Sequence, residues 1–431
     1  MRRDGSSRFA PANKYGYFPA ASVGWNISNE KFWNVSGSTV SQLKLRASYG
    51  KLGNDNIADY QFQSVINSGI VYTFNDVRYT GGLQTSVVSE KIKWESKTIT
   101  NAGFDATFMN GKFDLTAEYY NTKSEDVLVG VPIPATVGSI NLNPIVNAAS
   151  LQNSGIEVAL GYHKNSGKFR FDVSGNFSTV KNKVLALGGN NEPITGAGAR
   201  TAVGGEVGRH YGYVYEGIFQ TAAEVLAHAT QQPNVGPGDV KYKDISGPNG
   251  RPDGVISEAY DRVYLGSGIP KYHYGFNFSA TYQQFDFSLF ASGSADFLIN
   301  SRFYRDLMHS GGSANYHTDI LDRWTPTNTS TDIPRLNSAD VNNFRDSDRP
   351  GWLQDGSYLR INTLSVGYTL PANLIKGLIR SRIYVTAQNL YTFQSYKGYN
   401  PDFTSGVFNP GFDFGSYPKP RTIMIAIQVV F

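Results

Sequence analysis

The sequence contains no cysteine, so disulfide bonds and thiolate metal sites are excluded. It also lacks any run of about 20 apolar residues, the length that a transmembrane helix needs. Its 39 basic and 35 acidic residues nearly balance, and no block of basic residues suggests nucleic-acid binding. Helical membrane proteins, disulfide-rich domains and nucleic-acid binders are therefore excluded as classes.

The sequence also lacks the local motifs of common enzymes. It has no His-Glu-x-x-His array, no Gly-x-Ser-x-Gly elbow and no glycine-rich phosphate loop. His163 and His273 fall on the polar side of alternating segments, where wet polar positions explain them. We therefore expect that the protein is not an enzyme.

The first 18 residues carry the adjacent Arg2 and Arg3 but no apolar segment, so they do not form a secretory signal peptide. A chain that starts at this point could not be exported. We therefore expect that Met1 is not the start of the complete protein.

Aromatic residues are abundant, at 13%, and they alternate with polar residues instead of forming runs. In the segment 168–177, KFRFDVSGNF, Phe169 and Phe171 alternate with Arg170 and Asp172. Successive side chains of a strand point to opposite faces, so one face of this strand is aromatic and the other is charged. About eleven segments show the same pattern. They are 17–27, 42–50, 97–108, 112–123, 153–163, 168–177, 272–282, 285–294, 358–370, 381–392 and 422–431.

The connections between these segments are alternately short and long. Asn110-Gly111 predicts a two-residue type I′ hairpin, because both residues tolerate positive φ. Alternation of this kind places all the long connections at one end of the strands. The short turns are 109–112, 164–167 and 283–284, and the long connections are 51–96, 124–152, 183–270, 300–357 and 393–420.

The strand length favours a membrane barrel over a soluble β-sandwich. A stripe of about eight to ten residues, tilted by about 40°, covers roughly 20–25 Å, which matches the apolar band of an outer membrane. Sandwich strands average only about 5–6 residues. We predict an all-β fold, an antiparallel transmembrane β-barrel of about 11 strands with short periplasmic turns and long extracellular loops.

Several motifs in one order make the chain resemble the C-terminal half of the SusC/RagA-type TonB-dependent transporters of Bacteroidetes-like outer membranes. The resemblance covers nearly the whole chain. The motifs are RRDGSSRF (2–9), YGYFPAASVGW (15–25), LKLRASYGKLGN (43–54), NSGIEVAL (153–160), EGIFQ (216–220), LGSGIPKYHYGFNFSATYQQFDFSLF (265–290), YLRINTLSVGYTLP (358–371), RIYVTAQNLYTF (382–393) and GYNPDF (398–403).

This resemblance implies half of a roughly 22-stranded barrel that is closed by a plug domain. It also implies nutrient import energised through the TonB complex, with a SusD-like surface lipoprotein that captures glycans or peptides. Residues 1–431 are then the C-terminal part of the barrel, with the plug and signal peptide absent, and we expect a fragment that does not transport alone. The resemblance further implies that the outer surface of the barrel contacts outer-membrane lipid. It also implies that the barrel assembly machinery recognises the terminal Phe431 as an assembly signal.

Two other classes remain as alternatives. A passive porin or a surface-adhesion barrel needs no plug, but it still needs a signal and a closed sheet. A soluble secreted β-protein that binds carbohydrate would instead bury the aromatic faces in a dry core.

The loop 244–262 predicts one candidate metal site. Asp244, Asp253 and Asp261 surround a glycine turn, as oxygen ligands of calcium do in looped motifs. Proline residues interrupt this loop, and Tyr260 stands where a bidentate carboxylate is expected. A turn-rich external loop without metal is therefore the competing interpretation.

Two further groups have alternative interpretations. Tyr211, Tyr213, Tyr215, Trp324 and Trp352 lie in long connections, where such rings either stack on sugars or pack inside folded loops. The second group lies at alternate positions of one strand whose side chains face the water-filled interior of a barrel. These side chains either contact a plug domain or are simply hydrated. These residues are Arg382, Tyr384, Thr386 and Gln388.

Overall fold

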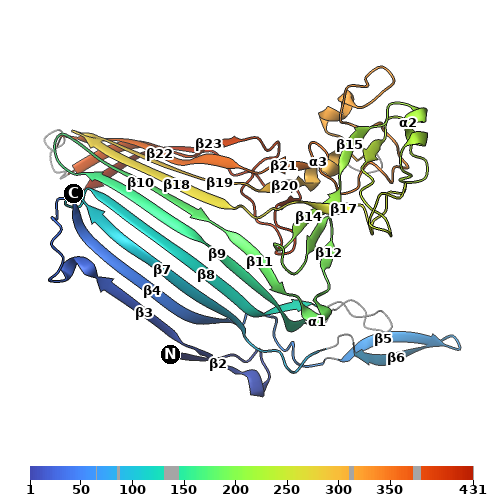
Figure 1. The fold of residues 1–431 in the computed structure, drawn as a ribbon, viewed down its shortest axis with the longest axis horizontal. Helices are drawn as coiled ribbons and strands as arrows, with labels where there is room; N and C mark the ends of the chain where they lie inside the picture. Colours follow the sequence, from blue (N-terminus) through green and yellow to red (C-terminus); the bar gives the residue numbers. More distant parts are fainter. Residues whose placement is uncertain (65, 85–87, 131–144, 310–314, 372–379, 431) are drawn as a thin grey trace. The chain divides into compact units, whose positions relative to one another are not determined.

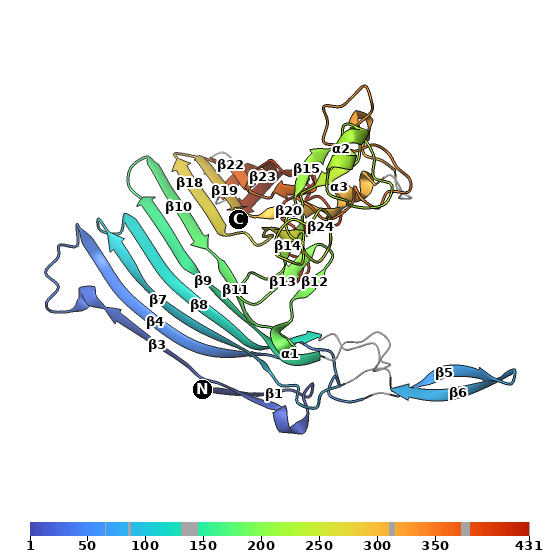
Figure 2. The ribbon, with the colours of Figure 1, turned by 45° about the vertical axis from the view of Figure 1, so that its right-hand side comes forward.

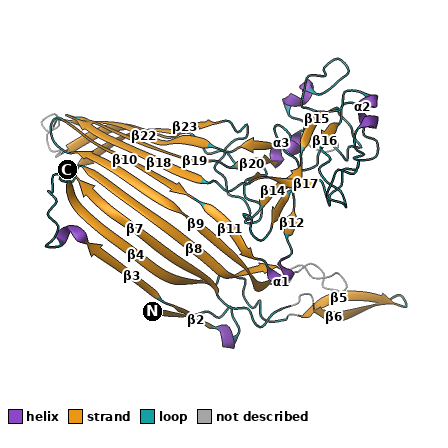
Figure 3. Ribbon diagram, in the orientation of Figure 1, coloured by secondary structure: helices purple, strands orange, loops and turns teal. Residues whose placement is uncertain are grey.

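The computed structural model describes residues 1–64, 66–84, 88–130, 145–309, 315–371 and 380–430. The chain divides into two compact units. Figure 1 shows its ribbon with colours that follow the sequence. Unit 1 comprises 1–158, 179–193 and 202–205, and unit 2 comprises 159–178, 194–201 and 206–431. Strands dominate both units, and the helices are short (Figure 3). None of the helices in the described residues is both long and apolar enough to cross a membrane.

All the predicted strands are present, and they belong to one antiparallel sheet. The order of its hydrogen-bonded neighbours is β25-β23-β22-β19-β18-β10-β9-β8-β7-β4-β3, with β11 beside β9. The predicted antiparallel all-β fold is therefore confirmed. The bounds are β3 Ala20–Asn26, β4 Val40–Asn54, β7 Glu95–Phe108, β8 Phe113–Gly130, β9 Ile145–Lys164, β10 Phe169–Thr179, β11 Lys181–Ala186, β18 Tyr272–Tyr282, β19 Phe285–Ala295, β22 Tyr358–Leu370, β23 Arg380–Gln394 and β25 Thr422–Val430.

In unit 2, one face of the sheet is lined by aromatic rings that meet across neighbouring strands. The Phe278 ring lies 6.3 Å from the ring of Phe171 and 5.6 Å from that of Phe287. At the edge of this stripe, Phe285 is 55% exposed, and its ring lies 4.8 Å from that of Tyr368. Figure 2 shows β18, β19, β22 and β23 side by side. The predicted alternation is therefore realised as a continuous apolar face.

Unit 1 builds its part of the sheet from β3, β4, β7, β8 and the first part of β9. Leu45, Tyr49 and Tyr119 point away from its polar face and are 42%, 48% and 51% exposed. A small buried cluster joins Phe9 and Phe18 to Trp94, whose ring lies 5.3 Å and 5.5 Å from theirs. Near it, β1 (Arg2–Gly5) pairs with β2 (Tyr15–Phe18).

The predicted turn at 109–112 is confirmed in its bounds, but it is not a two-residue hairpin. The hairpin between β7 and β8 is confirmed, but the N–H of Gly111 donates to the carbonyl of Phe108 at 3.2 Å. Met109 and Asn110 are therefore its central residues, with φ of 51° and 58°. The prediction of an Asn110-Gly111 centre was wrong because Phe108 pairs with Phe113, which leaves a four-residue loop. The predicted turn at 283–284 is confirmed by the pairing of Tyr282 with Phe285.

The long connections contain folded structure of their own. Strands β8 and β9 run further into the predicted connection 124–152 than expected, to Gly130 and from Ile145. In unit 1, β5 (Ile66–Phe74) and β6 (Val77–Gln84) form a two-stranded hairpin (Figure 1). In the described residues of unit 2 the connections form three small sheets, two α-helices and the short 3-10 helix Thr318–Asp322. Their bounds are β12 Ile194–Gly196, β13 Ala199–Thr201, β14 Arg209–Tyr213, β15 Tyr215–Ile218, α2 Ala222–Ala227, β16 Val240–Tyr242, β17 Arg262–Gly266, β20 Leu298–Ser301, α3 Arg302–Leu307, β21 Leu353–Asp355 and β24 Phe412–Asp413.

Candidate functional site

The second face of the sheet in unit 2 is polar, as the alternation predicts. Arg382 makes two charge-assisted hydrogen bonds to Asp286, at 2.8 Å and 2.5 Å. On the same face His163 Nδ1 lies 2.7 Å from a carboxylate oxygen of Asp172. Such a face of fixed charges suits the wall of a wet interior.

The polar face of the sheet in unit 1 also carries ion pairs between side chains of neighbouring strands. The guanidinium of Arg46 lies 3.3 Å from Asp105 and also pairs with Glu118. The hydroxyl of Thr116 donates to Asp105 at 3.1 Å. One cation therefore pairs with two carboxylates across neighbouring strands, so these three groups together carry a net negative charge.

The long connections of unit 2 pack around a hydrophobic core of their own. Tyr213, Val240, Tyr242 and Ile256 are buried together in one cluster. The rings of Tyr213 and Tyr242 lie 5.3 Å apart. These loops are thus a folded body that can hold a binding surface in a fixed shape.

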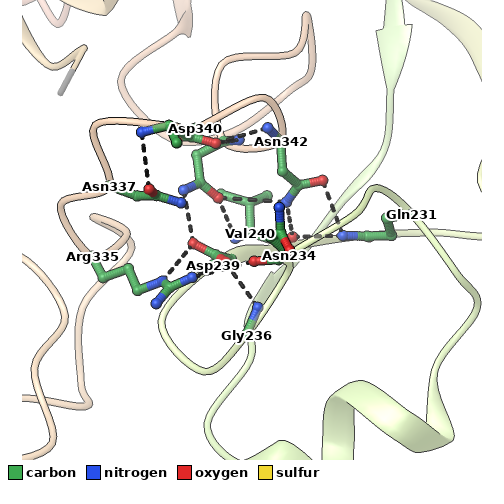
Figure 4. Close-up of polar contacts among 11 residues, drawn as sticks. Gln231, Asn234, Gly236, Asp239, Val240, Arg335, Asn337, Asp340 and Asn342 are labelled. Carbon is green, nitrogen blue, oxygen red and sulfur yellow. Dashed lines mark hydrogen bonds and ion pairs between the residues drawn. The ribbon is translucent and has the colours of Figure 1, made fainter. Parts of the chain in front are cut away.

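The buried carboxylate of Asp239 links the connection 183–270 to the connection 300–357 through hydrogen bonds (Figure 4). Asp239 is only 1% exposed, and it accepts hydrogen bonds from Arg335 Nε and Nη2 at 2.9 Å and 2.8 Å. The Nδ2 group of Asn343 donates to it at 3.0 Å and the N–H of Gly236 at 2.9 Å. Both carboxylate oxygens are therefore satisfied, and the pKa of Arg335 is raised, chiefly by this hydrogen bond to Asp239.

Side-chain amides extend the network along the backbone of β16. The carbonyl of Val240 accepts from Gln231 Nε2 at 2.9 Å and from Asn342 Nδ2 at 2.8 Å. The N–H of Val240 donates to Asn343 Oδ1 at 2.7 Å. Amide side chains replace a neighbouring strand here, which fixes the loop around 342–343 against β16.

We expect Arg335→Ala to destabilise this loop body by about 2–3 kcal/mol, because Asp239 stays buried without its cation. The cost falls below that of a fully buried pair, since the Arg335 side chain is 35% exposed. Proteolysis of the intact protein should cut the loops faster in this variant. Arg323→Ala is the matched control, because among the described residues the Arg323 side chain makes only a 3.5 Å hydrogen bond, to the Ile320 carbonyl. Equal cleavage rates in the two variants would contradict the prediction.

The aromatic residues singled out in the long connections belong mostly to this folded core. Tyr211, Tyr213, Trp324 and Trp352 are 7%, 3%, 9% and 2% exposed. The hydroxyl of Tyr215 donates to Asp332 at 2.9 Å. Stacking of these four buried rings on a sugar is therefore ruled out in this conformation, and packing inside folded loops is the correct interpretation.

The three aspartates of the predicted calcium loop lie in the same loop but bond to backbone N–H groups. Asp261 is fully buried and accepts from the N–H of Ser257 at 2.7 Å. Asp244 accepts from the N–H of Gly254 at 2.7 Å, and Asp253 accepts from a backbone N–H two residues further on. Within the described ranges, no group of three or more His, Cys, Asp or Glu side chains could hold a metal ion. The structure thus does not assemble the three as ligands, and calcium binding stays a prediction.

Other predicted residues lie as follows. Thr386 is on the polar face, where its hydroxyl donates to Ser365 at 2.9 Å, and the Arg382 guanidinium lies 4.3 Å from the centre of the Tyr384 ring. His273 Nδ1 lies 2.9 Å from the Ser294 hydroxyl, on the polar face as predicted. Phe431 lies outside the described residues.

One buried histidine of the loop body was not singled out by the sequence. His210 on β14 is 1% exposed, and its Nε2 lies 3.0 Å from the carbonyl of Leu298. Its ring lies 5.1 Å from that of Phe412. The pKa of His210 is lowered to about 4, chiefly by burial and also by the positive charge of Arg302, against the hydrogen bond to Leu298, which raises it. No local sequence signal identifies it, because its neighbours come from distant segments.

Comparisons with known proteins agree with this architecture. A family model described as "TonB dependent receptor-like, beta-barrel" matches residues 1–390. TonB-dependent receptor P3 of Formosa agariphila is 32% identical over 449 residues, which cover 100% of this chain and 43% of that protein. TonB-dependent receptor SusC of Bacteroides thetaiotaomicron is 28% identical over 453 residues, which cover 100% of this chain and 42% of that protein.

Solved structures give the same fold. The structure of the RagAB peptide transporter superposes with a TM-score of 0.80 at 23% identity, and the match covers 99% of this chain and 45% of that chain. The present chain therefore spans less than half the length of the relatives that it matches.

Proposed function

Because the chain belongs to the TonB-dependent receptor-like β-barrel family, which lies in the outer membrane, we propose that it forms the barrel portion of an active nutrient importer. The family consists of transporters and receptors, not of enzymes. The single observation that carries the proposal is the long antiparallel sheet with an aromatic face and a charged face. This is the arrangement that a wall between lipid and water requires.

The proposed partners follow from this role. Residues 1–431 act as the C-terminal part of the barrel, and we place the TonB complex on a plug-bearing segment outside these residues. A SusD-like surface lipoprotein captures glycans or peptides above the folded loops. The barrel assembly machinery inserts the chain, with Phe431 as the assembly signal. Calcium at Asp244, Asp253 and Asp261 is not needed for this role.

The role of importer can be tested by uptake in cells. Growth on panels of glycans and of oligopeptides as sole carbon source should fail on at least one panel when the gene is deleted, and return on complementation. Loss of TonB should abolish the same growth, because active import takes its energy through that complex. Growth that depends on the gene but persists without TonB would identify a passive porin and reject the proposal.

A further inference from the structure

A pocket of about 160 Å³ lies beside helix α3 in unit 2. Its apolar wall is formed by Phe303, Tyr304, Leu307 and Tyr399. The rings of Phe303 and Tyr399 lie 5.6 Å apart, and Tyr399 is 60% exposed at the rim. An apolar cavity of about 150 Å³ is large enough to take up benzene. The pocket therefore fits one aromatic ring or one branched aliphatic side chain.

Most polar side chains of the wall are already engaged with protein groups. Gln354 donates to the carbonyl of Gly351 at 2.6 Å and accepts from the N–H of Lys397 at 3.0 Å. The hydroxyl of Tyr304 donates to Asp319 at 2.9 Å, and that of Ser301 lies 3.2 Å from the hydroxyl of Tyr396. A sugar ring would bury hydroxyl groups here with few free partners, which costs free energy for each of them. The wall therefore favours an apolar group over a sugar.

The positively charged side chain of Lys397 lies beside this apolar wall. Lys397 lines the pocket and is exposed, and its Nζ has no hydrogen bond or ion pair with any other residue in the part of the chain that the structure describes. The carboxylate of Asp319 is already engaged with two residues of the wall, because it accepts from Tyr304 and lies 3.2 Å from His317 Nδ1. Lys397 is therefore free to bind an anion.

We propose that this pocket binds the carboxy-terminal residue of a short peptide, with its apolar side chain against Leu307 and Phe303 and its carboxylate on Lys397. Phe414, which is 67% exposed, directly precedes Gly415, whose Cα faces the Phe303 ring, and it offers further apolar surface to the rest of the peptide. A free aromatic acid presents the same two groups without a peptide chain. The inference rests on the proposed importer function, because it names the substrate class of that importer.

The test measures binding to the intact protein, purified from outer membranes in detergent, by calorimetry. The probes are Gly-Gly-Phe, its C-terminal amide, phenylacetate and maltotriose. Gly-Gly-Phe should bind, and the amide should bind at least about tenfold more weakly, because it lacks the charge-assisted contact to Lys397. Phenylacetate should bind more weakly than the tripeptide, since it lacks the peptide contacts at the rim.

Variants locate the site. Lys397→Gln should weaken Gly-Gly-Phe at least about tenfold and leave the amide unchanged. Tyr399→Ala should weaken both, because the ring forms the rim. Lys243→Gln is the matched control, because Lys243 is an exposed lysine of unit 2 that does not line the pocket, and it should bind like the parent. Equal binding of acid and amide, phenylacetate as tight as the tripeptide, or displacement by maltotriose would each overturn the proposal.

The two proposals fail separately. TonB-dependent uptake with no binding of Gly-Gly-Phe rejects the pocket and leaves the importer standing. Binding of Gly-Gly-Phe together with uptake that persists without TonB rejects the importer and leaves the pocket as a peptide site.

Discussion

Phe278→Arg should destabilise the protein in lipid by about 2–4 kcal/mol, because a charge near the bilayer midplane on the lipid face of a barrel carries that cost. Phe278 lies near the middle of β18, between the rings of Phe171 and Phe287. Asn277→Arg is the matched control one residue away, because Asn277 points to the opposite, polar face, and its cost should be close to zero.

The measurement is urea-induced unfolding of the intact protein in lipid vesicles, with both variants compared with the parent. Equal penalties at the two positions would refute the assignment of faces. A small penalty at both would mean that β18 does not meet lipid at all, and it would reject the membrane barrel itself.

Acidification from pH 7 to pH 4 should destabilise the loop body of unit 2 by about 3 kcal/mol through His210. Burial holds the pKa of His210 at about 4 in the folded chain, against 6.5 for an ordinary histidine. Between these two values the unfolded chain binds a proton that the folded chain does not bind. The stability is therefore fully present above about pH 6.5 and is lost as the pH falls through about 4.

Hydrogen exchange of the loops at pH 7, 5.5 and 4 would measure this loss once it is corrected for the intrinsic exchange rates. His210→Gln should flatten the difference, because Gln has no proton to bind in this range. His273→Gln is the control, since His273 is exposed and should keep the pH dependence of the parent. The same pH dependence in the His210 variant would assign the effect to other groups.

The sequence alone was sufficient for the sheet and insufficient for the loops. Alternation is a local pattern, so strands such as Tyr272–Tyr282 and their two faces could be predicted one segment at a time. Asp239 and Arg335 are 96 positions apart, and nothing near either residue indicates the other. For the same reason, the sequence could not predict that Trp352 is buried and therefore cannot stack on a sugar. The pocket beside α3 combines residues from several connections, which is equally invisible in a local pattern.

The strand order has a consequence for the kinetics of folding. Most neighbours in the sheet are close in sequence, such as β18 and β19, which need only a two-residue reversal. Strands β10 and β18 also pair, yet the chain between them runs from 180 to 271. Chain-entropy loss for closing a flexible segment grows by only about 0.6 kcal/mol for each doubling of its length, but the closure slows the search. The hairpins on either side should therefore assemble early, and the β10–β18 seam should close last.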